Sequence, residues 1–162
     1  GSSASLYVQT TLKAMAGAQQ QIFQAKLLLD IASALHYLHS LSPAIVHGDI
    51  KGDNVMVETF KNCPKGKLLD FGMSRIRTRR ARLLGGSRHW IAPELIGPVA
   101  ARPNPLPSAD VYSFGWMIYF VSTFTHPSAA ICHQAVQSQS PSSSLNLYWP
   151  KGGSRYLAEP LV

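Results

Sequence analysis

The longest apolar run in the sequence extends over 14 residues, from Val111 to Phe124, and is interrupted by Ser113 and Ser122. It is too short to cross a bilayer, which requires about 20 apolar residues. A helix that is apolar on every side is normally buried inside a domain. We therefore expect a buried helix at these residues, around which the rest of the chain must pack.

Two polar residues ahead of this run predict where the helix begins. Ser108 is a suitable N-cap, because its hydroxyl can accept a hydrogen bond from a free backbone N–H of the first turn. Asp110 would lie in that turn, where the helix dipole favours a negative charge. The helix is thus predicted to start at Ser108.

The composition is that of a folded domain with few charges. The chain has 162 residues, of which 46% are hydrophobic and 14% are charged, so it can bury a core and forms one domain at most. These values argue against a disordered chain, a collagen and a disulfide scaffold. The two cysteines show no metal-binding or redox spacing and are expected to be free thiols. We expect an intracellular protein, in the cytoplasm, with no membrane anchor.

The positive charge of the chain comes from one segment. The formal net charge is +7, and no acidic residue occurs between Asp70 and Glu94. The same interval contains six arginines, whose removal would leave +1: Arg75, Arg77, Arg79, Arg80, Arg82 and Arg88. A solvated loop is the more ordinary interpretation of such a run, and recognition of an acidic substrate is the alternative.

The remaining sequence predicts helical structure together with one small β-hairpin. Apolar residues recur every three or four positions across residues 19–39, which indicates a helix. Short β-type segments at 55–57 and 67–69 flank a turn-forming stretch and predict a hairpin. Residues 1–18 and 128–162 show no sustained pattern and are expected to be irregular.

Four short motifs occur along the chain in a fixed order. The first reads H-G-D-I-K-G-D-N at 47–54, and the second reads D-F-G at 70–72. The third reads G-S-R-H-W-I-A-P-E at 86–94, and the fourth reads S-A-D-V-Y-S-F-G at 108–115. Together they resemble the catalytic loop, the metal-binding motif, the substrate-pocket loop and the buried helix of eukaryotic protein kinases. Each motif alone is a weak signal, whereas four in the order of the family are a strong one.

The resemblance implies a role in phosphoryl transfer for four polar residues. Asp49 would accept or orient the proton of the attacking hydroxyl, and Lys51 would place its ammonium against the transferred phosphate. Asn54 and Asp70 would bind Mg²⁺, a hard cation that prefers oxygen ligands. Without the other motifs, the same residues would be interpreted as solvated polar side chains of loops. The implied cofactors are ATP and Mg²⁺.

Five further residues receive supporting roles from the same resemblance. Met56 would lie under the adenine ring, and Ser87 would line the substrate pocket. His47 would be a packing residue rather than a catalytic histidine. Asp110 would tie down the backbone of the catalytic loop, and Glu94 would form a buried ion pair with a downstream arginine.

Individual positions refine the kind of kinase that the chain resembles. Ser87 stands where serine/threonine kinases commonly carry threonine and tyrosine kinases carry proline, and Trp90 occurs in the tyrosine-kinase-like branch. H-G-D is also found in small-molecule kinases of similar fold, but Lys51 and the W-I-A-P-E stretch favour a protein kinase. Gly48 replaces the arginine that binds an activation-loop phosphate in many members, so control by phosphorylation of that loop is less expected.

The predicted fold is therefore mainly α (α+β): a protein-kinase-like C-terminal lobe with a small β-hairpin beside the catalytic loop and no N-terminal lobe. A partial kinase domain is predicted at 19–127, between the irregular segments 1–18 and 128–162. The sequence contains no Gly-rich phosphate loop and no lysine strand or glutamate-bearing helix of the kind the family carries. We expect ATP-dependent phosphorylation of protein serine or threonine hydroxyls by the whole enzyme, and little activity from this fragment alone.

Two other functions remain open from the sequence. The lobe could be a non-catalytic binding or regulatory module that holds protein partners in the same groove. Nucleic-acid binding through the arginine-rich segment is disfavoured, because that segment lacks interleaved aromatic residues and a recognised nucleic-acid-binding fold. The expected partners are ATP and a protein substrate, and the sequence leaves the oligomeric state open.

Overall fold

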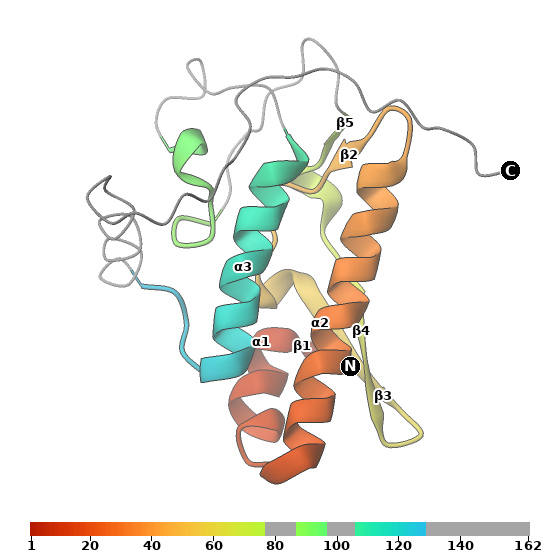
Figure 1. The fold of residues 1–162 in the computed structure, drawn as a ribbon, viewed down its shortest axis with the longest axis vertical. Coiled ribbons are helices and arrows are strands. Elements are labelled where there is room, and N and C mark those ends of the chain that lie inside the picture. The colour runs from red at the N-terminus through yellow and green to blue at the C-terminus, as the bar shows by residue number, and fades with distance from the viewer. Residues whose placement is uncertain (77–86, 97–105, 129–162) are drawn as a thin grey trace, which may run out of the picture.

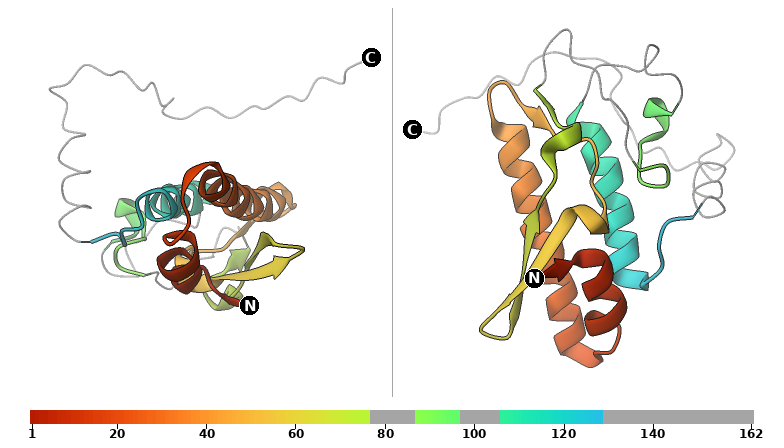
Figure 2. Two further views of the ribbon diagram at one scale, coloured as in Figure 1. Left: turned by 90° about the horizontal axis from the view of Figure 1, so that it is seen from below. Right: turned by 180° about the vertical axis from the view of Figure 1, so that it is seen from behind.

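Two long helices stand side by side in the computed structural model, which describes residues 1–76, 87–96 and 106–128 (Figure 1). The first, α2, covers Gly17–Ser40, and the second, α3, covers Pro107–Thr123. Seen from below, they form one layer, with a short N-terminal helix and a β-hairpin on one side of it (Figure 2). None of the helices in the described ranges is long and apolar enough to cross a membrane.

The helix predicted at 19–39 is confirmed by α2. Its buried residues are spaced three or four positions apart and so lie on one face of the helix: Leu27, Ile31, Leu35 and Leu38. The helix contacts both α3 and the second strand of the hairpin. The apolar period seen in the sequence is therefore the period of the packed face.

The predicted start of α3 and its predicted burial on all sides are both wrong. Pro107 lies at the start of the helix and Leu106 is the N-cap, without a capping side chain, so Ser108 is not the cap. Proline suits the first turn, because the N–H that it lacks would have no helical partner there. Val111 and Ile118 are 59% and 43% exposed, so the described residues cover only one side of the helix.

The expectation of an irregular segment at 1–18 is also wrong. Ser2–Ser3 form the strand β1, Ala4–Tyr7 form the helix α1, and Val8–Leu12 form a π-helical turn. Four side chains of this segment are buried in the core: Ala4, Tyr7, Val8 and Leu12. Helices this short are not stable by themselves in water and depend on tertiary packing. They are also too short to show a repeating apolar pattern in the sequence.

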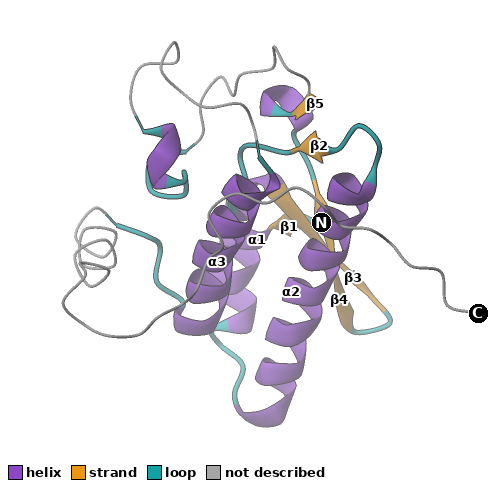
Figure 3. Ribbon diagram, turned by 45° about the horizontal axis from the view of Figure 1, so that its top comes forward, coloured by secondary structure: helices purple, strands orange, loops and turns teal. Residues whose placement is uncertain are grey.

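The predicted hairpin is confirmed and is longer than expected. Its strands are β3 (Val55–Phe60) and β4 (Cys63–Leu68), and β1 joins the other edge of β3 to give the antiparallel order β1-β3-β4 (Figure 3). Lys61 and Asn62 connect the strands with φ angles of 48° and 59°. Two consecutive residues with positive φ are the requirement of a tight two-residue hairpin turn.

A second antiparallel pair of strands brackets the motifs at 47–54 and 70–72. Strand β2 (Ile45–Val46) leads into the first motif, strand β5 (Arg75–Ile76) follows the second, and the two strands pair. Short 3₁₀ turns are present at Gly52–Asn54 and Phe71–Met73. The pairing of β2 with β5 therefore holds the two motifs close together, although 15 residues separate Asn54 from Asp70 in the chain.

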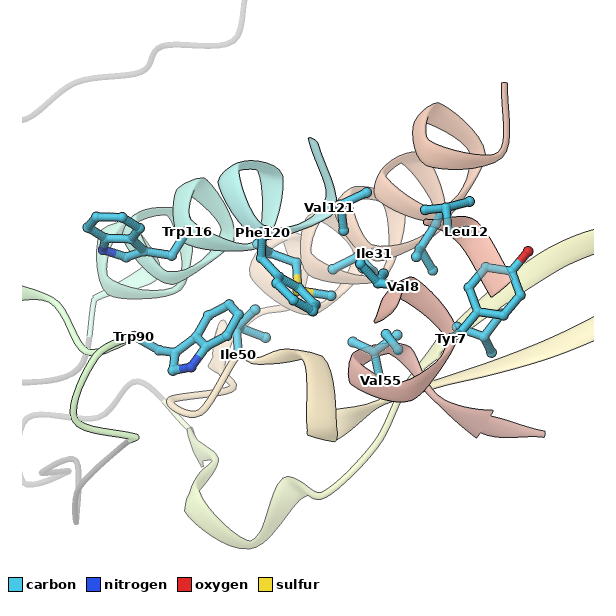
Figure 4. Close-up of a cluster of buried hydrophobic side chains, with 14 of the residues drawn as sticks. Tyr7, Val8, Leu12, Ile31, Ile50, Val55, Trp90, Trp116, Phe120 and Val121 are labelled. Atoms are coloured by element: carbon cyan, nitrogen blue, oxygen red, sulfur yellow. The ribbon is translucent and has the colours of Figure 1, made fainter. Parts of the chain in front are cut away.

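The main hydrophobic core lies where α1, α2, α3 and the expected catalytic loop meet (Figure 4). Ile50 from the loop and Phe120 from α3 are fully buried in it. Trp90 packs edge-on against Phe120 with ring centroids 6.1 Å apart. A smaller cluster joins Leu95 of the 3₁₀ turn Pro93–Leu95, and Ala92 just before that turn, to Ala109 at the start of α3. The third motif is thus anchored on the same helix as the fourth.

Several sequence predictions fall on residues outside the described ranges. These are most of the arginine-rich segment, at 77–86, and the expected irregular tail from residue 129 onward. Two arginines of the segment, Arg75 and Arg88, do lie within the described residues.

Candidate active site

Asp49 is the centre of a cluster of hydrogen bonds. Its Oδ2 accepts from Lys51 Nζ and from Asn54 Nδ2, each at 2.8 Å. Its Oδ1 accepts from the backbone N–H of Ser87 at 2.9 Å. Lys51 Nζ also donates to the hydroxyl of Ser87 at 2.7 Å. The structure therefore brings Ser87 of the third motif into direct contact with two residues of the first, Asp49 and Lys51.

The environment of Asp49 favours its ionised form. The residue is only 9% exposed, and burial by itself would raise the pKa of its carboxyl group. The hydrogen bonds from Lys51 and Ser87 and the positive charge of Lys51 outweigh burial and hold the pKa below its ordinary value of 3.8. Asp49 is thus a carboxylate at neutral pH and can accept a proton or a hydrogen bond from a hydroxyl group.

Acid is expected to remove the contribution of Asp49 to stability. Because its folded-state pKa lies below the unfolded-state value, the contribution is complete above about pH 4 and is lost as the pH falls through the folded-state pKa. The difference in free energy of unfolding between the wild type and Asp49→Asn should shrink from pH 7 to pH 3. Urea unfolding at pH 7, 5 and 3 measures this difference, and a constant difference would contradict the expectation.

A backbone hydrogen bond holds the chain before Asp70 against Asn54. The N–H of Leu69 donates to the carbonyl of Asn54 at 2.8 Å, which fixes the chain just before Asp70. Asp70 is exposed, has a φ of 59°, and accepts the N–H of Gly72 on its Oδ1 at 3.1 Å. Within the described residues, its second carboxylate oxygen has no hydrogen bond.

The oxygen atoms of Asn54 and Asp70 fit the preferences of Mg²⁺. The amide nitrogen of Asn54 is bound to Asp49, which leaves the amide oxygen as the atom able to bind a cation. An amide oxygen and an exposed carboxylate are hard ligands of the kind that Mg²⁺ takes together with phosphate oxygens and water. No group of three His, Cys, Asp or Glu residues that could hold a metal occurs in the described ranges. A magnesium ion here would therefore need further ligands from a bound phosphate.

Asp110 of α3 fixes the start of the loop at 47–54 through hydrogen bonds to its backbone. It is 1% exposed, and its two carboxylate oxygens accept the backbone N–H groups of His47 and Gly48, each at 2.8 Å. His39 Nε2 lies 2.8 Å from the same carboxylate. These contacts match the tying of the loop backbone that the resemblance implies for Asp110.

His47 is fully buried and packs inside the loop. Its Nδ1 accepts the N–H of Asp49 at 3.3 Å, so its Nε2 carries the proton and donates to the carbonyl of Leu69 at 3.0 Å. Its ring also lies 5.1 Å from the ring of Phe71. Both nitrogens are occupied by backbone groups, which suits a packing residue.

Gly48 adopts a conformation that favours glycine. Its φ is 82°, in a region that residues with a side chain rarely enter. The arginine that the resemblance associates with this position would have to be accommodated on a strained backbone here. The geometry of this loop therefore agrees with the glycine in the sequence.

Met56 and Glu94, two residues with predicted supporting roles, differ in burial: Met56 is half-buried and Glu94 is exposed. Met56 is half-buried on β3, where it lies between Ser3 of β1 and Lys67 of β4. Glu94 is exposed and makes no ion pair with any other described residue, whereas the resemblance implies a buried ion pair with a downstream arginine. Arg155, which is the only arginine in the sequence after residue 102 and therefore the candidate partner, lies outside the described residues, so this ion pair stays a prediction.

Ser5 is a residue beside the loop that the sequence analysis missed. Its hydroxyl is buried and is the one side-chain polar atom without a hydrogen-bond partner among the buried atoms of the described residues. It lies so close to Gly52 that a Cβ at that position would come within 2.5 Å of it. The spacing of the buried residues Ala4, Val8 and Leu12 was the available signal that this segment is helical and reaches the loop.

An apolar pocket of about 480 Å³ lies beside the D-F-G motif. It is formed between the C-terminal half of α2, strand β4 and Phe71. Tyr37, Leu69 and Phe71, which line it, are 65%, 37% and 49% exposed. The motifs are therefore bordered by a face rich in exposed apolar groups.

Comparison with known proteins finds related kinases. A probable serine/threonine-protein kinase of Dictyostelium discoideum is 33% identical over 133 residues, which are 76% of this chain and 12% of the relative. Serine/threonine-protein kinase CTR1 of Arabidopsis thaliana is 33% identical over 120 residues, which are 68% of this chain and 13% of the relative. Another Arabidopsis chain, the probable serine/threonine-protein kinase SIS8, is 35% identical over 105 residues, 63% of this chain and 10% of the relative. The chain thus spans a small part of the length of the relatives it matches.

The family comparison covers most of the chain. The sequence profile of the protein kinase domain matches residues 7–151, which begins before the predicted boundary at 19 and ends after the one at 127. The match includes the four motifs, the π-helical turn Val8–Leu12 and the whole of α2. The chain therefore belongs to the protein kinase domain family.

Proposed function

We propose that this site transfers the terminal phosphoryl group of ATP to a serine or threonine hydroxyl of a protein. The observation that carries the proposal is the ionised carboxylate of Asp49, held in one orientation by Lys51, Asn54 and Ser87. Phosphoryl transfer needs mainly positioning and charge stabilisation, which a fixed carboxylate and a fixed ammonium provide. The serine/threonine names of the relatives support the choice of hydroxyl.

In this proposal Asp49 orients the substrate hydroxyl and receives its proton. Lys51 lies 2.8 Å from Asp49 and would bring its ammonium to the transferred phosphate from the same side. Because Ser87 contacts both side chains, it lines the place where the substrate hydroxyl must enter. Each of these contacts fixes a side chain before substrate arrives, which lowers the cost of orienting it in the transition state.

Asn54 and Asp70 would hold Mg²⁺ through their side-chain oxygens. The bound magnesium nucleotide would supply the phosphoryl group and neutralise charge on the phosphates. Met56, half-buried on β3, is the apolar residue proposed to face the adenine ring.

We further propose that the chain forms the large lobe of a two-lobed kinase. The described residues contain the catalytic loop, D-F-G and the helix beneath them. The pocket beside D-F-G and the exposed side chains of Tyr37, Leu69 and Phe71 suit a face covered by a further lobe. The alternative is a non-catalytic binding module that holds a protein partner in the same groove.

Replacing one magnesium ligand tests the proposed chemistry. The assay measures transfer of labelled phosphate from ATP to a serine peptide by the longest natural protein that contains this chain. Transfer should require Mg²⁺. Asp70→Asn should reduce the rate of transfer by about 10²-fold or more, since charge stabilisation by the metal is lost. Asp53→Asn is the matched control, because Asp53 is exposed in the same loop and has no hydrogen bond or ion pair with another residue that the structure describes.

The isolated 162-residue chain gives a second measurement. It is expected to transfer little phosphate by itself, because adenine and phosphate contacts from a second lobe are missing. Strong transfer by the isolated chain would contradict the two-lobe proposal. Failure of the longest natural protein to bind ATP in the presence of Mg²⁺ would instead favour the non-catalytic module.

A further inference from the structure

The turn that follows Ser87 is anchored at both ends. The backbone N–H groups of Trp90 and Ile91 donate to the carbonyl of Ser87 at 2.8 and 3.1 Å. Trp90 is 9% exposed and packs on Phe120, and its carbonyl accepts the hydroxyl of Ser113 at 2.7 Å. The other end is held by the bonds of Ser87 to Asp49 and Lys51. Side chains within this turn are therefore presented from a fixed backbone.

Arg88 is the charged residue that this turn presents to solvent. It is exposed and is bonded covalently to Ser87, whose N–H touches the carboxylate of Asp49. No ion pair joins it to another residue of the described ranges, and the next acid in the sequence, Glu94, is not its partner. The backbone of Arg88 is thus fixed one residue from the contact with Asp49, and an exposed guanidinium group without an acidic partner among the described residues will attract a negative group.

The charge of the surrounding residues does not cancel this attraction. The negative charge of Asp49 is already paired with the positive charge of Lys51 at 2.8 Å, so Asp49 repels an approaching acidic group only weakly. No other acid occurs between Asp70 and Glu94, whereas that interval holds six arginines. The guanidinium of arginine binds a carboxylate with two parallel hydrogen bonds, which also sets the orientation of the partner.

We propose that Arg88 makes this site select protein substrates with an acidic residue next to the hydroxyl that is phosphorylated. The inference rests on the proposed function, since it assumes that the hydroxyl approaches Asp49. A peptide whose hydroxyl reaches Asp49 passes Ser87 and brings its neighbouring side chain to Arg88. A glutamate or aspartate there gains an ion pair, whereas a lysine there meets a like charge.

Peptide binding to the whole chain tests the proposal without requiring catalysis. Three labelled peptides of equal length would carry one serine flanked by glutamate, by glutamine or by lysine, and fluorescence anisotropy would give their affinities. The glutamate peptide should bind the wild type about fivefold more tightly than the glutamine peptide, the upper range for an exposed ion pair. Arg88→Glu should reverse the preference toward the lysine peptide, with a change in the affinity ratio on the order of tenfold.

A charge reversal elsewhere separates a local effect from a general one. Lys61→Glu changes the net charge equally but lies at the exposed turn between β3 and β4. It should leave the preference for the glutamate peptide in place. Equal preferences in the wild type and Arg88→Glu, or the same loss in both variants, would overturn the role of Arg88.

Two further readouts distinguish the other outcomes. A single-stranded RNA of the same net charge that binds more tightly than the glutamate peptide, and loses affinity in Arg88→Glu, would overturn the proposal in favour of nucleic acid. Phosphoryl transfer to the three peptides is measured separately with the longest natural protein. Transfer without charge preference would reject the inference alone. A binding preference without any transfer would reject the proposed chemistry and, with it, the selection of a phosphorylated hydroxyl.

Discussion

Replacing Asp110 by alanine is expected to lower the free energy of unfolding by about 3–5 kcal/mol, because removal of a buried charged partner leaves its donors unsatisfied. The N–H groups of His47 and Gly48 both depend on this carboxylate, and His39 bonds to it as well. Each buried donor left without an acceptor costs about 1–3 kcal/mol. Asp110 therefore links three segments: α3, the end of α2 and the catalytic loop.

Urea or thermal unfolding of the chain measures this loss. Asp53→Ala serves as control, because Asp53 is an exposed acid of the same loop, and it should change stability by less than about 0.5 kcal/mol. The loss of stability in Asp110→Asn should fall between these two values. The amide oxygen of asparagine can still accept one of the hydrogen bonds, whereas its NH₂ group is a donor and would face another donor. A stability of Asp110→Ala equal to that of Asp53→Ala would show that the loop is held by other contacts.

Replacing Asp49 by asparagine is expected to lower kcat for phosphoryl transfer by about 10²–10⁴-fold, the usual contribution of a positioned acid or base. Asparagine is close in shape but cannot accept the proton. The KM for ATP should change little, because the proposed role of Asp49 is toward the substrate hydroxyl. The assay uses the longest natural protein that contains the chain, with Mg²⁺, ATP and a serine peptide.

The same assay with Asp53→Asn gives the matched control for Asp49. Asp53 carries the same change of charge but is exposed, so kcat should stay within about twofold of the wild type, as for a surface change away from the reaction. An unchanged kcat in Asp49→Asn would remove Asp49 from the proposed chemistry. A parallel loss of ATP binding would mean that the variant has lost its fold rather than its base, and the unfolding curves separate these two cases.

The sequence predicted those elements whose signal lies in residues close together along the chain. The spacing of Leu27, Ile31 and Leu35 indicated the helix that became α2, since a helical face repeats within a few residues. The turn residues between the two β-type segments indicated the hairpin. The order of the motifs at 47–54 and 70–72 indicated the family, which the profile match over 7–151 confirms.

Features that depend on distant contacts were missed or were wrong. The N-terminal residues Ala4 and Tyr7 become helical by packing on the core, and a four-residue helix has no period long enough to recognise. The start of α3 was placed at Ser108, although Pro107 was the better indication. The exposed positions of Val111 and Ile118 depend on which elements cover the helix, and no local pattern contains that information.

The sequence by itself determined which chemical groups the site contains and in what order they occur along the chain. A carboxylate, an ammonium and oxygen ligands at Asp49, Lys51, Asn54 and Asp70 are properties of residue type, and residue type can be read without coordinates. The tertiary structure alone decided that Ser87 reaches Asp49 across 38 residues and that Asp110 holds the loop across 62 and 63 residues. A pKa and a hydrogen bond depend on atoms within a few ångströms, and only folding brings such distant residues to that separation.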